Sequence, residues 1–71
     1  MKGFDVVIDL FNSFPKSKFD VASVIAATSD TCSSFQARAV IREAVDMKII
    51  RWEWAETRTG AKKVYALNQQ T

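Results

Sequence analysis

Hydrophobic residues recur at the spacing of amphipathic helices in three segments of the first 47 positions. Across the first segment, residues 4–14, polar side chains occupy one narrow arc of a helix and apolar side chains the rest. Such a wide apolar arc means either that the helix is deeply buried in its own domain or that one edge meets a second subunit. Pro15 ends the segment, since the residue before a proline avoids helical geometry.

The second predicted helix, residues 20–28, begins at Asp20, whose carboxylate can accept from free backbone N–H groups. Phe19 is expected in a brief extended piece just before this cap, where it could pack on Val24 as a hydrophobic staple. The helix is short and rich in alanine, so it should pack closely against a neighbour. One face carries Val21, Val24, Ile25 and Thr28.

A polar turn at residues 29–33 separates this helix from a third one, residues 33–47, which Thr31 or Ser33 would cap. The predicted core side of the third helix holds Ala37, Val40, Ile41, Ala44, Val45 and Met47. The opposite side holds Phe35, Arg38, Ala39, Arg42 and Asp46. We expect Phe35 to fold back over the preceding turn, with a thymine methyl contact as the alternative.

After the third helix the pattern changes to the two-residue period of a strand. Apolar and charged residues alternate from Ile50 to Trp54, and we expect Ile50, Trp52 and Trp54 to face the core. A partner contact is the alternative for Trp54. Residues 62–67 form the predicted return strand, and residues 56–61 connect the two, with Gly60 able to adopt a positive φ. Residues 68–71 should fray.

Length and composition indicate one small globular domain spanning residues 1–71. The chain is 48% hydrophobic and 25% charged, which argues against disorder. With one cysteine and no histidine, neither an internal disulfide nor a zinc site is expected, and the compartment should be a reducing cytoplasm. No apolar run approaches the roughly 20 residues of a membrane span, and no export signal is expected.

Positive charge gathers in the second half of the chain. Residues 1–32 carry three lysines against four aspartates, whereas residues 33–71 carry seven Lys/Arg against four Asp/Glu. The balance therefore changes from −1 to +3, as in a nucleic-acid-binding surface. A solvated face with no ligand is the alternative.

The order of helix, short strand, helix, turn, helix and hairpin resembles the winged helix-turn-helix family, in the form of small MarR-, ArsR- and PadR-like or phage regulators. The resemblance covers residues 4–67 and rests on the helix entry at 19–26, the helix-to-strand junction at 44–50 and the return strand at 59–67. It implies an α+β fold with three helices followed by a two-stranded wing, and a possible short extra strand near Phe19. The family commonly has a glycine where Lys48 stands here, so this helix must end without the residue that most easily becomes left-handed.

The resemblance implies that the third helix enters the major groove of DNA while the wing contacts the backbone or the minor groove. On the helix it nominates Ser34, Gln36, Arg38 and Arg42. Glutamine can pair with adenine, arginine with guanine, and a serine at a helix start can bind phosphate. The alternative is that the two arginines only solubilise the helix, beside Glu43 and Asp46.

In the wing, the resemblance nominates Arg58, Lys62 and Lys63 for the phosphates or the minor groove. The alternative is that these residues only protect an exposed hairpin edge from pairing. Lys16 and Lys18, in the loop before the second helix, are further candidates for backbone contacts.

Catalysis finds little support, because nucleophile–base arrangements usually include histidine. Asp5 and Asp9 share a helix face, which is more typical of a solvated surface than of a cation site. Cys32 precedes a helix start, where a thiol can be activated, but an inert thiol is favoured. We expect a non-enzymatic protein without cofactor, metal or small-molecule ligand.

The sequence thus predicts a protein that binds double-stranded DNA sequence-specifically, as a transcriptional regulator. A homodimer could form through Val6, Leu10 and Phe11 on the wide apolar arc, which would place two modules on adjacent half-sites. The competing hypothesis is a winged-helix protein–protein interaction module within a larger assembly.

Overall fold

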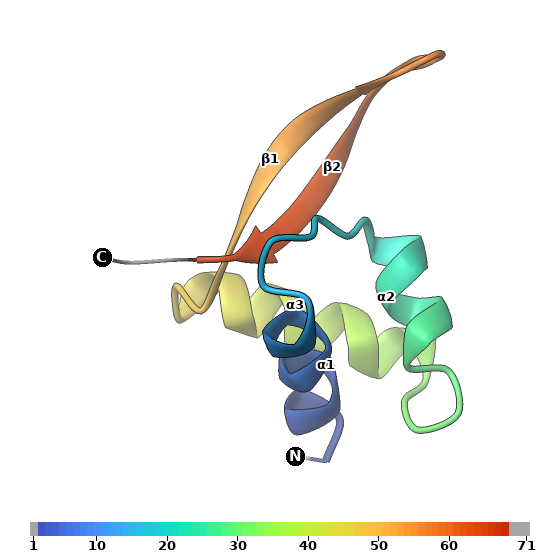
Figure 1. The fold of residues 1–71 in the computed structure, drawn as a ribbon. Coiled ribbons are helices and arrows are strands. Elements are labelled where there is room, and N and C mark those ends of the chain that lie inside the picture. The colour runs from blue at the N-terminus through green and yellow to red at the C-terminus, as the bar shows by residue number, and fades with distance from the viewer. Residues whose placement is uncertain (1, 69–71) are drawn as a thin grey trace.

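Three helices precede an antiparallel hairpin in the computed structural model, which describes residues 2–68 (Figure 1). The elements are α1 (Lys2–Ser13), α2 (Val21–Ala27), α3 (Ser34–Asp46), β1 (Ile50–Thr57) and β2 (Gly60–Leu67). The predicted α+β class and the order of elements are therefore confirmed. Compared with the prediction, the first helix begins two residues earlier and ends at Ser13, which leaves Phe14 outside it and exposed.

Side chains cap the starts of α2 and α3, as the polar residues ahead of them predicted. Asp20 Oδ1 accepts from the backbone N–H of Ser23 at 2.7 Å. Ser33, and not Thr31, caps α3: its Oγ accepts from the N–H of Gln36 at 3.1 Å. Gln36 Oε1 in turn accepts from the N–H of Ser33 at 3.0 Å, which completes a capping box.

Helix α3 ends in a Schellman motif that places a lysine in the left-handed conformation. The N–H of Ile49 donates to the carbonyl of Ala44 at 2.9 Å, and that of Lys48 to Val45 at 3.0 Å. Lys48 has φ +62 and is the one non-glycine residue with a positive φ within residues 2–68. The junction thus adopts the conformation that glycine would adopt most easily.

The hairpin is longer and its turn tighter than the pattern predicted. Pairing runs without interruption from Ile50 opposite Leu67 to Thr57 opposite Gly60, so only Arg58 and Thr59 form the turn. The predicted connection over residues 56–61 is therefore wrong. Gly60 does adopt a positive φ, +136, and its carbonyl accepts from Thr57 Oγ1 at 3.1 Å. These two features let the chain reverse within two residues.

The extended piece at Phe19 pairs with the free edge of β2. The N–H of Phe19 donates to the carbonyl of Tyr65 at 2.8 Å, and the N–H of Tyr65 donates back at 2.7 Å. The ring of Phe19 lies edge-on to those of Phe11 (centroids 5.4 Å apart) and Phe14 (6.2 Å apart). This single bridge joins the segment after α1 to the base of the hairpin.

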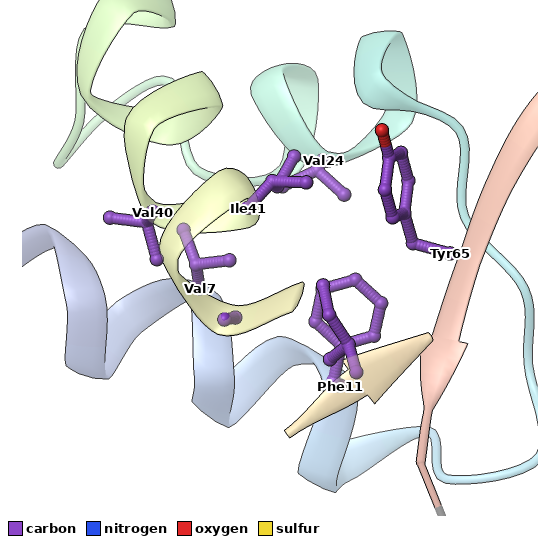
Figure 2. Packing of buried hydrophobic residues seen from close by; sticks show 8 residues of the cluster. Val7, Phe11, Val24, Val40, Ile41 and Tyr65 are labelled. Atoms are coloured by element: carbon purple, nitrogen blue, oxygen red, sulfur yellow. The ribbon is translucent and has the colours of Figure 1, made fainter. Parts of the chain in front are cut away.

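The core lies between the three helices and the base of the hairpin. Figure 2 shows Phe11 from α1, Val24 from α2 and Tyr65 from β2 around one space. The buried cluster comprises Val7, Phe11, Val24, Val40, Ile41, Ala44, Ile50 and Tyr65. Phe4, Ile8 and Leu10 of α1 also pack against this cluster. Most of the wide apolar arc of α1 is therefore used within the domain.

Several expectations about individual side chains are wrong. Phe11 is completely buried, so it is not available as the dimer contact that the apolar arc suggested. Met47, which follows the last residue of α3, is exposed and does not belong to the core. Asn68 does not fray: its N–H donates to the Ile49 carbonyl at 2.9 Å and its Nδ2 to the Lys48 carbonyl at 3.0 Å. Residues 69–71 of the predicted frayed tail lie outside the described residues.

Trp52 and Trp54 are not core residues, contrary to the prediction. Their exposed fractions are 43% and 65%, although they share a strand face with the buried Ile50. The hairpin projects well beyond the helices (Figure 1), so the helices cover this face only at its base. The two-residue period identified the face correctly but carries no information on how far the covering layer extends.

Candidate nucleic-acid interface

The two faces of the hairpin carry different chemistry. We call one of them the aromatic face; its side chains are Trp52, Trp54, Lys63 and Tyr65. These residues are paired across the hairpin, since Trp52 lies opposite Tyr65 and Trp54 lies opposite Lys63. Successive residues in a strand point to opposite faces. The ion-paired face therefore comprises Arg51, Glu53, Ala55, Lys62, Val64 and Ala66.

Basic side chains at the ion-paired face form ion pairs with carboxylates of the same chain. Lys62 Nζ lies 2.8 Å from Asp20 Oδ2, and Lys18 pairs with Glu53. Because Phe19 pairs with Tyr65, its neighbours Lys18 and Asp20 project toward this face of the sheet. The Lys62 ammonium, followed by the hydroxyl and N–H of Ser23, holds the pKa of Asp20 far below its usual range. The hydrogen bond from Lys18 similarly lowers the pKa of Glu53.

On the aromatic face, the two indoles contact each other. The rings of Trp52 and Trp54 are edge-to-face, with centroids 5.7 Å apart and an interplanar angle of 85°. Lys63 Nζ lies 4.3 Å from the centroid of the Trp52 ring, within the range of a cation–π interaction. The aromatic face thus combines exposed aromatic surface with positive charge.

A groove of about 460 Å³ runs between α3 and the aromatic face. This α3–hairpin groove is lined by Val21, Arg38, Ile41, Arg42, Val45, Asp46, Trp52, Lys63 and Tyr65. Arg38 and Arg42 are one helical turn apart, so both guanidinium groups lie on the same side of α3. Three cations therefore face one space together with a single carboxylate, that of Asp46.

Three of the predicted site residues, Arg38, Arg42 and Lys63, are brought together in this groove. Lys62 is not among them, because it lies on the opposite face of the hairpin and pairs with Asp20. Arg58 lies in the turn at the far end of the hairpin.

The other two predicted residues lie in the first turn of α3, ahead of the groove. Ser34 is the first residue of the helix and is exposed. Gln36 is also exposed, but its side-chain oxygen is engaged in the capping box with Ser33. Its amide nitrogen would be the group available to an external partner.

Aromatic residues form the part of the site that the sequence pattern missed. Trp52 and Tyr65 line the groove, and Trp54 lies one step further along the same face. The available signal is the spacing of Trp52 and Trp54, which places both on one face, but the same spacing is also typical of core packing. Phe35 is 80% exposed, so the expected folding back over the preceding turn is wrong.

The remaining candidates are not gathered into any site. Cys32 is buried, with its Sγ 3.9 Å from the carbonyl oxygen of Gly3 toward which it points, so the thiol acts as a packing group. Asp5 and Asp9 are exposed on α1. Lys16 is exposed in the loop after α1, and Lys18 pairs with Glu53.

Comparisons with known proteins give no relative from which a function could be transferred. No family model, curated protein or solved structure matches the chain significantly. None of the helices within residues 2–68 has both the length and the apolar character needed to cross a membrane.

Proposed function

We propose that this chain is a winged helix-turn-helix protein that binds double-stranded DNA, as a transcriptional regulator. In this proposal α3 lies in the major groove and the hairpin acts as a wing on the backbone or the minor groove. The observation that carries it is the α3–hairpin groove, where Arg38, Arg42 and Lys63 face one space. The element order, with the Phe19 bridge ahead of α2, is consistent with a winged-helix layout.

The chemistry of these cations suits duplex DNA, which has a polyanionic backbone and bases that accept hydrogen bonds in the major groove. Duplex DNA presents one negative charge per roughly 1.7 Å of its axis, so clustered cations bind it by releasing counterions. Arginine can also form two hydrogen bonds with guanine in the major groove. Arg38 is the residue that we assign to base reading, and Lys63 and Arg42 are assigned to the phosphates. Ser34, Gln36 and Arg58 are proposed as flanking contacts.

Lys62 and Lys63 provide a matched test, because they are adjacent lysines on opposite faces of the hairpin. Binding of a fluorescent random duplex would be measured by anisotropy from low to high salt for Lys63→Gln and Lys62→Gln. Each phosphate contact contributes about 0.9 to the slope of log K against log salt. We expect Lys63→Gln to reduce the slope by about that amount and Lys62→Gln to change it much less.

Two results would contradict the proposal. Equal slopes for the two variants would mean that only overall charge matters, which removes the groove as the binding site. No duplex binding even at low ionic strength would exclude binding of double-stranded DNA by this chain. Selection of bound sequences from random DNA would then test specificity, with Arg38→Ala costing about 1–3 kcal/mol at one base position.

A protein–protein interaction module is the second candidate, and exposed apolar side chains favour it. Phe35, Met47 and Trp54 are large and exposed. A partner that covers them would bind the chain with weak salt dependence, whereas DNA binding weakens steeply as salt rises. The salt titration therefore separates the two candidates.

Two copies on adjacent half-sites would provide the contact area that specific binding usually requires. Val6 and Leu10, which are only partly buried on α1, are the proposed contacts for such a homodimer. Sedimentation of Val6→Asp tests this, because a dimer should become a monomer. A wild-type chain that is monomeric at high concentration refutes it. Phe11→Asp is not a useful test, since Phe11 belongs to the core.

A further inference from the structure

The indoles of Trp52 and Trp54 are exposed, so they contribute little to the stability of the fold. Tryptophan normally buries most of its large surface. Here both side chains lie beyond the base of the strand face, which is the part that the helices cover, and Trp54 is the more exposed of the two. Two neighbouring aromatic rings on a projecting hairpin therefore need an explanation other than the core.

Their arrangement leaves Trp54 better placed than Trp52 to receive a flat ligand. Lys63 Nζ already lies over the ring of Trp52. Trp54 contacts Trp52 edge-to-face and is 65% exposed. Trp52, whose own ring is covered by Lys63, therefore packs against the ring of Trp54, while most of the Trp54 surface stays open to a ligand.

Charge around the indoles indicates the class of ligand. Lys63 lies opposite Trp54 in the hairpin, and Arg38 and Arg42 line the same groove as Trp52. Exposed aromatic rings beside several cations suit a ligand that repeats a flat aromatic group and a negative charge. Single-stranded nucleic acid has this composition, since its bases stack on aromatic side chains and its phosphates follow basic grooves. The bases of an intact duplex are stacked on one another, so they do not offer their faces to the indoles.

We propose that Trp52 and Trp54 form a stacking platform for unpaired bases, and that the α3–hairpin groove thereby binds single-stranded DNA as well as duplex. The inference takes its ligand class from the proposed function but concerns a separate activity. Arg38, Arg42 and Lys63 hold the phosphates, while a base stacks on Trp54. Trp52 holds the ring of Trp54 in place.

The test uses the full chain and three DNA probes of about 12 nucleotides, which lies within the site sizes known for single-strand-binding domains. The probes are an oligothymidine, an abasic strand with the same number of phosphates, and a duplex. Binding is followed by anisotropy and by the protein's own tryptophan fluorescence. We expect the oligothymidine to bind more tightly than the abasic strand and to quench the tryptophan emission.

Substitutions test whether the tighter binding of oligothymidine depends on the two tryptophans. Stacking on one aromatic side chain corresponds to about a 5- to 150-fold change in affinity, so Trp54→Ala should weaken oligothymidine binding within that range. Trp54→Phe should retain most of the affinity, and Lys62→Gln, on the other face of the hairpin, should have little effect. Circular dichroism melting of each variant establishes that it is folded before its binding is compared.

The possible failures are distinguishable. Equal affinity for the oligothymidine and the abasic strand, without quenching, would overturn the platform and leave duplex binding intact. An unchanged oligothymidine affinity in folded Trp54→Ala would overturn it as well. Failure of all three DNA probes would overturn both the platform and the proposed function, and would leave the exposed indoles to a protein partner.

Discussion

The helical body and the outer part of the hairpin, residues 52–63, differ in what their large side chains do. In the body, Phe11 and Val24 are completely buried, and α2 and α3 both begin at a side-chain cap. In the outer hairpin, Trp52 and Trp54 are exposed beside Lys63. Both regions are held by regular backbone hydrogen bonds, so regularity of the backbone does not distinguish them.

Strand β1 shows the difference within one element. Ile50 and Trp54 share a face of this strand, yet Ile50 is buried by the helices and Trp54 lies beyond them. Residues of the first kind contribute to folding, because they remove apolar surface from water. Residues of the second kind contribute little to folding and remain available to a ligand. Stability and binding should therefore respond to different substitutions.

The largest expected effect on stability comes from creating a cavity in the core at Phe11. Phe11→Ala should cost about 3–5 kcal/mol in the free energy of unfolding, which is a large part of the total expected for a chain of this size. Trp54→Ala, in the outer hairpin, should change it by no more than about 0.5 kcal/mol. Urea denaturation of both variants measures the contrast. Similar losses at the two positions would show that the two regions are not distinct.

The contact between the body and the hairpin at Asp20 should have an intermediate effect. Asp20→Ala removes the cap of α2 and the ion pair with Lys62, and should cost about 1 kcal/mol, mostly from the cap. Asp20→Asn keeps a capping oxygen and should cost less. Thermal or urea unfolding of both variants, with and without Lys62→Gln, separates the cap from the ion pair. A larger cost for the asparagine would contradict this assignment.

The same contact predicts how stability depends on pH. The pKa of Asp20 is lower in the folded chain than in the unfolded chain, where it should be about 3.9. The carboxylate therefore stabilises the fold above that pH, and this contribution is lost as the pH falls below about 4 toward the folded-state pKa. Glu53, with a lowered pKa of its own, acts in the same direction. The wild type should lose part of its stability advantage over Asp20→Asn on acidification, as measured by denaturation at several pH values.

A smaller effect, of opposite sign, is expected where α3 joins β1. Lys48 adopts a left-handed conformation that disfavours side chains with a Cβ, so Lys48→Gly should stabilise the protein by about 0.5–1 kcal/mol. Lys48→Ala keeps the Cβ and is the matched control, with little change expected. Denaturant midpoints of the two variants provide the measurement. Destabilisation by glycine would show that the Lys48 side chain has a contact of its own.

Much of the fold was predictable, because its determinants lie close together in the sequence. The sequence predicts Asp20 as the cap of α2, and Thr31 or Ser33 as the cap of α3, because these polar residues lie just before an apolar helical pattern; the structure has Asp20 and Ser33. Gly60 is predicted to allow a positive φ within the connection; it does adopt one, but as the first residue of β2. The site was predictable only in part. The sequence nominates Arg38, Arg42 and Lys63 as DNA contacts, which stays a prediction, and it does not indicate that the three line one groove.

The hairpin that follows α3 illustrates the limit of sequence patterns. The alternation of residues placed Trp52 and Trp54 on one face, and adjacent positions placed Lys62 and Lys63 on opposite faces. Only the tertiary structure decided which residues, or solvent, each face of the hairpin contacts. The Phe19–Tyr65 bridge brings Asp20 to Lys62, and the extent of the helices leaves the tryptophans uncovered. Local periodicity determines the direction of a side chain, whereas its burial and its partner depend on segments that are distant in the sequence.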